Sequence, residues 1–481
     1  MNEFNENLAA VLRRSVNGFI QLDAVERLSG GASQETYRIN ATVEDGNIQL
    51  AMRRAAGGRW IPSSNKASER NAELGPGLEA EAELFRRAGA RGIPGPAVIE
   101  ELKADDGLGS GFLMTWLDGE TLGHKIAQAE DFAEIRPTLA QQCGEILAQI
   151  HQMEWAGTAL ESHLEVLDPK TFVERQWAWY RSFGSPQPMI DYTARWLLEN
   201  LPPTTPYTLV HNDFRNGNLM IDRNVGIIGV LDWEVAHIGD PMRDLGWLCT
   251  PSWRFGRADL PVGGFGSREA LYAAYTRAGG RSIDPSHVFF WEVFGSFWWA
   301  IGCLSMAQHY RSGPDRSVER PAIGRRSSEC QIDCVNLLIP GPVTELSPPD
   351  PASEEDSLPT TLELVESVRK YLREDVTTQT EGRPRFYARV AANTLDIVER
   401  EIRVGDKQRT DELTRLRRLL GTHGSLTHLR QNLVEKIRSN EFELEDEALT
   451  HHLRETTYAR VMIDQPHYPG ARYARDAQRP P

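Results

Sequence analysis

Residues 209–234 read LVHNDFRNGNLMIDRNVGIIGVLDWE, and this stretch decides the fold. Its first half sets His211, Asp213 and Asn218 at the spacing His-x-Asp-x-x-x-x-Asn, just before an apolar run that is typical of a strand. A second apolar run follows and ends at Asp232. A hairpin between the two runs would return Asp232 to the loop that carries Asp213. The stretch therefore predicts two carboxylates and an amide at one site.

These residue types are suited to phosphoryl transfer, and kinases carry the same spacing in their catalytic loop. The reaction needs a carboxylate that takes or orients the acceptor hydroxyl, and oxygen ligands that hold Mg2+ against the phosphates. We therefore expect Asp213 to be the catalytic base and Asn218 and Asp232 to be metal ligands. Mg2+ is needed because the ATP phosphates and these carboxylates would otherwise repel one another.

Two neighbours of this set are expected to be structural. His211 should brace the loop through hydrogen bonds and not act as an acid or a base. Asp244, in the segment DPMRDLG, should either cap the helix that follows or pair with the catalytic loop. Both residues are therefore predicted to serve as a scaffold for Asp213.

The composition of the whole chain excludes several classes of protein. Its 481 residues are enough for two or three domains, and a formal net charge of -15 argues against nucleic acid as a partner. Five scattered cysteines without a CxxC pair, and an N-terminus without the pattern of an export signal, predict a cytoplasmic protein. The most apolar segment, residues 288–306, is interrupted by Glu292 and by small residues. It predicts a buried helix and no membrane partner.

The order of predicted elements divides the chain into five parts. Strands around the turn at 44–47 and a helix at 78–90 precede the β-prone run 111–117, so residues 1–115 predict a nucleotide-binding lobe with a small antiparallel sheet. Residues 116–343 predict a helical lobe with the catalytic loop and the acceptor site. The remaining parts are a linker at 344–358, a helical domain at 359–470 and a flexible tail at 471–481.

A glycine-rich loop in the first lobe is expected to cover the nucleotide phosphates. The loop LSGGASQETY, residues 28–37, precedes two predicted strands, as the nucleotide loop of a kinase does. Gly30 and Gly31 would let backbone N–H groups approach the phosphates, and Ser33 would add its hydroxyl. Two glycines are more often a simple turn, but the catalytic loop downstream favours a nucleotide loop.

A cation on the third strand should hold the phosphates, and a helix carboxylate should fix that cation. The run AMRR offers arginine where kinases use lysine. Arg53 can grip phosphate oxygens through its planar fork, and Arg54 is the alternative. Three glutamates of the helix at 78–90 compete as its partner, and spacing does not choose among Glu79, Glu81 and Glu83. We favour Glu81.

Over residues 20–335 the chain resembles the aminoglycoside phosphotransferase and choline kinase superfamily. The segments GGASQETY, MRR, HNDFRNGN and LDWE carry the resemblance. It implies an α+β, bilobal protein-kinase-like fold, with a small antiparallel-sheet N-lobe and a mainly helical C-lobe, followed by a small all-α domain. It also implies an ATP- and Mg2+-dependent phosphotransferase acting on a hydroxyl group, with an adenine hinge at Met114, Trp116 and Leu117. Gln34 departs from the family, in which asparagine is usual.

Within that superfamily the chain looks most like the kinase-like domains at the front of certain acyl-CoA dehydrogenases. The likeness rests on GGAS, on the arginine in MRR, and on HNDFRNGN followed by LDWE. The acceptors that it implies are hydroxyacyl-CoA thioesters. The helical part from residue 358 onward is similar to an uncharacterised domain that accompanies phosphotransferases of this branch in bacteria.

Two groups of residues in the second lobe bear on the acceptor. A basic stretch could bind the phosphates of coenzyme A, and an aromatic run could line an acyl channel. The basic residues are Arg311, Arg316, Arg320, Arg325 and Arg326, opposed by Asp315 and Glu319, and the aromatic residues are Trp291, Phe294, Phe297, Trp298 and Trp299. The alternative is that the aromatics fill a helix core and the arginines lie in a solvated loop.

Three hypotheses for the function follow. The first is a kinase of a hydroxyacyl-CoA, and the second is a kinase of an aminoglycoside-like compound, an amino sugar or another small alcohol. The third is a nucleotide-binding pseudoenzyme whose helical domain recruits a partner. The intact set of Asp213, Asn218 and Asp232 argues against the third. The sequence does not identify the acceptor, the choice between ATP and GTP, the oligomeric state or the role of the helical domain.

Overall fold

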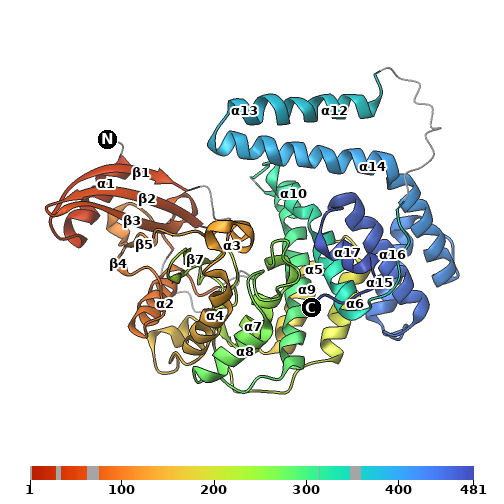
Figure 1. Cartoon of the computed structure of the whole chain (residues 1–481), viewed down its shortest axis with the longest axis horizontal. Helices are drawn as coiled ribbons and strands as arrows, with labels where there is room; N and C mark the ends of the chain where they lie inside the picture. Colours follow the sequence, from red (N-terminus) through yellow and green to blue (C-terminus); the bar gives the residue numbers. More distant parts are fainter. Residues whose placement is uncertain (1–2, 29–33, 62–74, 314, 347–358) are drawn as a thin grey trace. The chain divides into compact units, whose positions relative to one another are not determined.

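The computed structural model describes residues 3–28, 34–61, 75–313, 315–346 and 359–481 (Figure 1). The chain forms two compact units. The first unit comprises Met1–Asp168, Pro203–Cys249 and Trp253–Val288. The second unit comprises Pro169–Pro202, Thr250–Ser252 and Phe289–Pro481.

The first unit begins with a small antiparallel sheet and two helices. These elements are α1 (Glu3–Ser15), β1 (Phe19–Arg27), β2 (Gln34–Val43), β3 (Gly46–Ala55), α2 (Leu78–Ala90), β4 (Val98–Glu101) and β5 (Gly111–Thr115). The strands lie in the spatial order β1-β2-β3-β5-β4, and neighbours are antiparallel. Val43 lies opposite Gly46, so a two-residue turn connects β2 to β3. The small sheet predicted for this lobe is confirmed.

The two helices cover opposite faces of this sheet. Side chains alternate along a strand, so directly opposed residues of neighbouring strands share a face. Met52 lies opposite Leu113, and both belong to a core cluster with Leu8 of α1. Arg53 lies opposite Phe112, whose ring centroid is 5.9 Å from that of an aromatic ring on α2. The alternation therefore directs Arg53 toward α2.

The remaining elements of the first unit carry the loop of residues 211–218. They are α3 (Gly123–Gln128), α4 (Arg136–His151), β6 (Thr208–Val210), β7 (Leu219–Asp222), β8 (Gly226–Val230), β9 (His237–Gly239), α7 (Met242–Cys249) and α8 (Arg268–Arg277). β7 and β8 form the antiparallel hairpin that the sequence predicts, with Leu219 opposite Val230, and β6 pairs with β9. The loop connects β6 to β7, and Asp232 follows β8. The hairpin therefore returns Asp232 to the loop.

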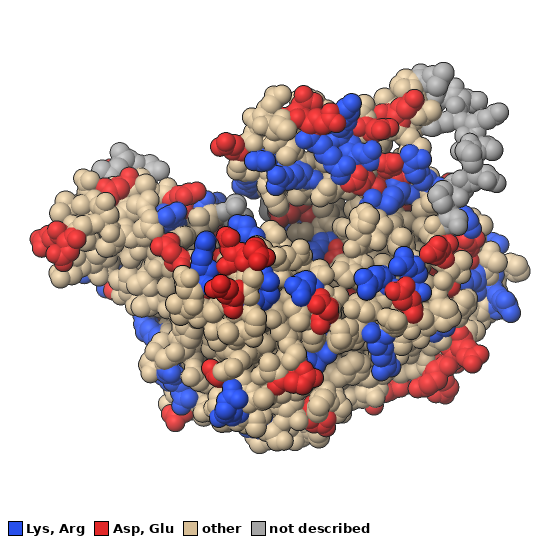
Figure 2. All heavy atoms as spheres, in the orientation of Figure 1, with Lys and Arg blue, Asp and Glu red and all other residues tan. Residues whose placement is uncertain are grey.

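The second unit is built from helices. They are α5 (Pro169–Arg181), α6 (Pro188–Glu199), α9 (Pro285–Ser312, whose first residues belong to the first unit), α10 (Glu319–Arg325), α11 (Ser327–Leu338), α12 (Thr361–Tyr371), α13 (Thr377–Gln379), α14 (Gly382–Leu420), α15 (Leu426–Arg438), α16 (Glu447–Asp464) and α17 (Pro469–Arg475). α12 lies along α14, where Arg369 bonds Asp396 at 3.1 Å. Figure 2 shows Lys and Arg side chains beside Asp and Glu over these two helices. Ion pairs therefore contribute to their packing.

Helix α9 is long and apolar enough to cross a membrane, alone among the helices that the structure describes. Its most apolar 18-residue window is 72% buried within the structure. Trp291, Phe294 and Phe297 are buried, and the ring centroid of Phe294 lies 4.7 Å from that of Phe172 on α5. This is the buried helix that the sequence predicts for residues 288–306.

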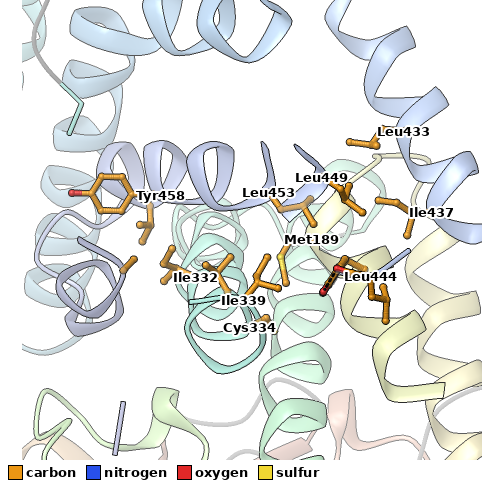
Figure 3. Close-up of a cluster of buried hydrophobic side chains, with 14 of the residues drawn as sticks. Met189, Ile332, Cys334, Ile339, Leu433, Ile437, Leu444, Leu449, Leu453 and Tyr458 are labelled. Carbon is orange, nitrogen blue, oxygen red and sulfur yellow. Dashed lines mark hydrogen bonds between the residues drawn. The ribbon is translucent and has the colours of Figure 1, made fainter. Parts of the chain in front are cut away.

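Helices from both ends of the second unit share one hydrophobic core (Figure 3). Met189 of α6 and Ile332 of α11 belong to the same cluster as Ile437 of α15 and Leu449 and Leu453 of α16. Each of these five side chains is at most 2% exposed. Burying an apolar side chain of this size contributes about 1.5–3 kcal/mol. The C-terminal helices therefore depend on α6 and α11 for their core.

Polar contacts join the same helices. Arg438 of α15 donates two hydrogen bonds to the buried carboxylate of Asp191 on α6, at 2.7 and 3.1 Å. The hydroxyl of Tyr192 donates to the carbonyl oxygen of Leu444 at 2.8 Å. Buried carboxylates need such partners, because an unpaired charge in the core is strongly destabilising. These bonds fix the register in which α6 meets the C-terminal helices.

The compact units divide the chain at places other than the predicted domain boundaries. Residues 169–202 and 289–343, predicted in the helical lobe, pack with the helices predicted as a separate domain at 359–470, because their apolar faces meet in one core. The predicted linker lies outside the described residues from 347 onward. The predicted flexible tail, 471–481, begins inside α17, where two small apolar side chains reach the core: Ala471 and Ala474.

Replacing Leu453 by alanine should destabilise the second unit by about 2–5 kcal/mol, because the change leaves a cavity in the shared core. Amide hydrogen exchange should then accelerate in α6 and α11 as well as in α16. The matched control is Leu364→Ala in α12, since that side chain is 54% exposed and its loss should change exchange little. Unchanged exchange in α6 and α11 would mean that the C-terminal helices form a core of their own.

Candidate active site

The catalytic loop and the segment after β8 both contain residues in the left-handed region. Asn212 has a φ of 67°, and Asp232 has a φ of 69°. Positive φ is uncommon outside glycine, and asparagine and aspartate tolerate it best. Such conformations persist only where the surroundings enforce them, and they gather at functional sites. The segments that carry the predicted base and metal ligands are therefore constrained in their backbone.

Asp244 of α7 enforces the conformation of the catalytic loop. Its carboxylate accepts hydrogen bonds from the backbone N–H groups of His211 and Asn212, at 2.9 and 2.7 Å. Nε2 of His151 on α4 lies 3.1 Å from the same carboxylate. The first turn of α7 is capped by Asp240 instead. The sequence left two roles for Asp244, a helix cap or a partner of the catalytic loop. In the structure Asp244 pairs with the loop.

Arg243 holds the same loop from the other side. Its Nε donates to Oδ1 of Asn212 at 2.9 Å, and both Arg243 and Asp244 are fully buried. Burial lowers the pKa of Arg243 to about 9. Burial alone would raise the pKa of Asp244, but the bonds from His151 and from the backbone outweigh it, and the pKa lies below 3.8. Asp244 thus holds the backbone of Asn212, and Arg243 holds its side chain.

His211 is buried, and its hydrogen bonds fit the bracing role expected of it. Its Nδ1 accepts from the N–H of Asp213 at 3.2 Å, and its Nε2 lies 3.0 Å from the carbonyl oxygen of Leu231. One accepting and one donating nitrogen is the pattern of a neutral imidazole. Burial lowers the pKa of His211, which favours this neutral form. The ring therefore links the loop to the residue that precedes Asp232.

The carboxylate of Asp213 is held by three donors. Nε1 of Trp247 and Nε of Arg215 donate to Oδ1, at 2.7 and 3.0 Å. Nδ2 of Asn218 donates to Oδ2 at 2.5 Å. The side chain is nevertheless 18% exposed. A carboxylate that is fixed in direction and still accessible can accept a proton from a bound hydroxyl.

Asn218 and Asp232 lie at adjacent ends of the β7–β8 hairpin, and their donor atoms suit Mg2+. The N–H of Leu231 donates to the carbonyl of Asn218 at 2.9 Å, which keeps the two segments together. Because Nδ2 of Asn218 bonds Asp213, Oδ1 is the atom that can face a cation. Mg2+ is commonly held by one or two such side chains together with phosphate oxygens. Among the described residues, no group of three His, Cys, Asp or Glu side chains is placed for a metal.

Arg53 connects the sheet to the residues after β8. Its Nε lies 3.0 Å from Oε1 of Glu81 on α2, and it donates to Oε1 of Gln34 at 2.5 Å. Its Nη2 donates to Oδ1 of Asp232 at 2.6 Å and to Oε2 of Glu234 at 3.1 Å. The structure thus brings together Arg53 and Glu81, the pair favoured from the sequence. Their roles toward a nucleotide stay predictions.

Two of the alternatives to this pair have other partners. Glu83 bonds Arg87 at 2.6 Å, one turn further along α2. Arg54 bonds Glu35 at 2.9 Å, and its guanidinium also takes part in a bond with the hydroxyl of Tyr37. Successive side chains of a strand point to opposite faces. The pleat of β3 therefore separates Arg54 from the site.

The Arg53 cluster sets three carboxylates around one guanidinium. Burial opposes the charge of Arg53, but Glu81, Asp232 and Glu234 outweigh it and raise the pKa of Arg53. Burial also raises the pKa of Glu81 to about 7, against the attraction of Arg53. An excess of negative charge at this point attracts a divalent cation and would repel phosphates that carry none. The electrostatics of the cluster therefore match a metal-bound nucleotide.

The other predicted nucleotide contacts are described in part. Outside the described residues lie Gly30, Gly31 and Ser33. Met114 is buried near the end of β5, and Trp116 follows that strand, with Nε1 donating to Asp118 at 2.8 Å. Leu117 packs against β8, where a Cβ added to Gly229 would lie 2.7 Å from Cδ1 of Leu117. The predicted hinge thus follows β5 and packs against the hairpin that carries the predicted metal ligands.

The residues considered for acceptor binding lie in the second unit, where several have structural partners. Three ion pairs occur there, at 2.6, 2.7 and 3.1 Å: Arg320 with Asp315, Arg325 with Glu401, and Arg326 with Glu329. Trp291, Phe294 and Phe297 are buried in the core around α9. These observations favour the structural alternative for both groups.

Sequence reasoning missed three residues at the site. Trp247 and Arg215 bond the carboxylate of Asp213, and Glu234 joins the Arg53 cluster beside Asp232. Arg215 and Glu234 are each two residues from a predicted site residue, and that proximity was visible in the sequence. Trp247 comes from α7, so only the fold brings it to the loop.

The arrangement typical of phosphotransferases with a protein-kinase-like fold is an antiparallel sheet joined to a helical lobe. Here the predicted base, Asp213, lies on a loop, and a predicted metal ligand, Asp232, lies at a hairpin end. The sequence profile of the family described as "Phosphotransferase enzyme family" matches residues 24–284, more than half of the chain, and the chain belongs to this family. The predicted resemblance is thereby confirmed. A second profile, a domain of unknown function (DUF6285), matches residues 378–468.

Curated relatives and a solved structure agree with this assignment. Acyl-CoA dehydrogenase family member 10 of Mus musculus is 25% identical over 226 residues, which are 46% of this chain and 19% of that protein. Acyl-CoA dehydrogenase family member 11 of Gallus gallus is 24% identical over 361 residues, 69% of this chain and 42% of that protein. The chain thus spans less than half the length of these relatives. A Ralstonia eutropha protein assigned as an aminoglycoside phosphotransferase shares the fold, at 20% identity and a TM-score of 0.53, over 68% of this chain and 95% of its own.

Replacing Asp244 by asparagine should lower the free energy of unfolding at neutral pH by about 2 kcal/mol or more, because an amide cannot accept all of the bonds to this carboxylate. The folded-state pKa of Asp244 is depressed, so its stabilising contribution is complete above pH 3.8 and is lost as the pH falls through that lower pKa. The difference in the free energy of unfolding between wild type and Asp244→Asn should therefore become smaller as the pH falls below 3.8. Urea unfolding across pH measures it, and a gap that stays constant into acid would contradict this role.

Proposed function

We propose that this protein transfers the γ-phosphoryl group of ATP to a hydroxyl group of a small-molecule acceptor, in a reaction that requires Mg2+. The observation that carries the proposal is the meeting of Asp213, Asn218 and Asp232 at one hairpin, with Asp232 bonded to Arg53 of the sheet. Such a set provides a proton acceptor, oxygen ligands and a phosphate-binding cation. Membership of the phosphotransferase family supports the same reaction.

The proposed reaction accounts for the proton, for the bond that forms and for the group that leaves. The acceptor hydroxyl gives its proton to the carboxylate of Asp213, and its oxygen forms a bond to the γ-phosphorus of ATP. The bond between that phosphorus and the oxygen bridging to the β-phosphate breaks, and ADP leaves. Trp247 and Arg215 hold Oδ1 of Asp213 in place while the proton moves. Bound Mg2+, held by Asn218 and Asp232, would neutralise charge on the phosphates.

The Arg53 cluster supports a second part of the reaction, the binding of the nucleotide. Arg53 is fixed by Glu81 and Gln34, so its guanidinium is oriented before a ligand arrives. A fork held in this way loses less conformational entropy when it binds phosphate oxygens. The hinge of Met114, Trp116 and Leu117 would take the adenine, and GTP is the alternative donor.

Hydroxyacyl-CoA is the acceptor that we place first. Support comes from the relatives named as acyl-CoA dehydrogenase family members, which match 46% and 69% of this chain. The acceptor that we place second is an amino sugar or another small alcohol, and the fold shared with the Ralstonia eutropha protein is compatible with it. The paired arginines of the second unit do not choose between the two.

A direct assay combines the purified chain with Mg2+, γ-labelled ATP and a panel of hydroxyacyl-CoAs, amino sugars and small alcohols. We expect phosphorylated hydroxyacyl-CoA and ADP in equal amounts. Asp213→Asn should lower kcat by about 10²–10⁴-fold with little change in KM, because it removes the proton acceptor and keeps the shape.

The matched control is Asp105→Asn, an exposed aspartate outside the catalytic loop. It should leave kcat unchanged. Absence of a phosphorylated product from every acceptor, or an Asp213→Asn variant as active as the wild type, would refute the proposed function. If only amino sugars or small alcohols gave a phosphorylated product, the proposed reaction would stand and the proposed acceptor would be wrong.

A further inference from the structure

We propose that Arg215 selects an acceptor that carries negative charge. The proposal rests on the proposed function. It adds the sign of the acceptor's charge and the residue that recognises that charge. Arg215 lies two positions after Asp213 in the catalytic loop. Its guanidinium is the cation bonded to the carboxylate expected to receive the acceptor's proton.

The guanidinium of Arg215 is held in a defined place. Its Nε donates to Oδ1 of Asp213 at 3.0 Å, and its Cζ lies 4.3 Å from the ring centroid of Trp253. The ring of Trp253 in turn meets that of Trp247 edge-on, with centroids 4.9 Å apart. Trp247 donates to the same oxygen of Asp213 at 2.7 Å. The two indoles and the carboxylate therefore fix a cation at the base.

Arg215 can still reach a ligand. Its side chain is 23% exposed, whereas Trp247 and Trp253 are buried. Its Nε–H is used by Asp213, and its Nη1 donates to the carbonyl oxygen of Asn216 at 3.4 Å. A guanidinium carries further N–H donors in its planar fork. A stacked guanidinium keeps its edge available for a carboxylate or phosphate oxygen. The fork is thus oriented before an anionic acceptor binds.

The segment next to the loop is basic, although the whole chain carries a formal net charge of -15. Residues 253–269 contain three arginines, Arg254, Arg257 and Arg268, against two acidic residues, Asp259 and Glu269, and Arg257 pairs with Asp259 at 3.1 Å. This segment lies against the loop, because Nδ2 of Asn216 donates to the carbonyl oxygen of Gly263 at 2.8 Å. The segment on this side of the loop therefore carries a small formal excess of positive charge.

These charges decide between classes of acceptor. A polycationic amino sugar would bring ammonium groups toward Arg215, and juxtaposed like charges disfavour a complex. An anionic hydroxy compound would gain an ion pair there, and Arg215 offsets the repulsion from Asp213. The shared chemistry is an anionic oxygen, which a carboxylate or a coenzyme A phosphate can supply.

The test compares wild type with Arg215→Gln on four acceptors: a hydroxyacyl-CoA, the matching hydroxyacyl-pantetheine, the free hydroxy acid and an amino sugar. The uncharged pantetheine thioester reports the loss that follows from releasing Asp213, which Arg215 also holds. Beyond that loss, kcat/KM for the anionic acceptors should fall by about a further tenfold or more in the variant. A loss with the coenzyme A thioester alone identifies a phosphate, and a loss with the hydroxy acid identifies a carboxylate.

Two further variants complete the design. Arg215→Lys keeps the charge and should preserve the preference for anionic acceptors at a lower rate. Arg223→Gln removes an exposed arginine at the β7–β8 turn and should change nothing. Calorimetric binding of the same acceptors without ATP should weaken in Arg215→Gln, while ADP binding should not.

Equal losses for charged and uncharged acceptors would overturn the proposal, because Arg215 would then act on the transferred phosphoryl group or on Asp213 alone. A wild type that prefers the amino sugar would overturn it as well. If no acceptor is phosphorylated, the proposed function fails, but binding of an anionic acceptor that depends on Arg215 would still support the selection. Binding that is equal in wild type and Arg215→Gln would contradict it independently of turnover.

Discussion

One largely buried guanidinium, that of Arg53, ties the parts of the active site together. It forms ion pairs with Glu81 on α2 and with the two carboxylates that follow β8, Asp232 and Glu234. Its side chain is only 14% exposed, so these charges interact in a medium that screens them less than water does. Its direction follows from the pleat of β3, which turns Arg54 to the opposite face. Arg53 therefore links the sheet to α2 and to the end of the β7–β8 hairpin.

Asp213, the proposed base, is positioned by a second and separate set of contacts. Asp244 and Arg243 of α7 hold Asn212 at a positive φ, and Trp247 of the same helix bonds the carboxylate of Asp213. One helix therefore fixes both the backbone before Asp213 and the direction of its side chain. The contacts of Arg53 and those of α7 are linked at the β7–β8 hairpin. There Asn218 contacts Asp213 through its side chain and the segment of Asp232 through its backbone. This arrangement explains how Asp213, Asn218 and Asp232 come together from one short stretch of chain.

The extent to which the sequence predicts this structure depends on how local each contact is. The hairpin and the adjacency of Asp213 and Asp232 follow from residues less than twenty apart, and so they were predicted. Trp247 was missed because helical periodicity shows which face is buried but not what it meets. The same limit hid the shared core of α6, α11 and the C-terminal helices. The polar composition of the chain end concealed the buried alanines of α17.

The central claim is that Arg53 organises the site for a metal-bound nucleotide, and calorimetric titration with MgADP tests it most directly. Arg53→Met should weaken binding by about tenfold or more, because a charged hydrogen-bond donor to phosphate is lost. Arg54→Met is the matched neighbour, and it should bind MgADP as the wild type does because its partners lie on the other face of β3. Equal affinity of the wild type and Arg53→Met, or a loss confined to Arg54→Met, would contradict the account.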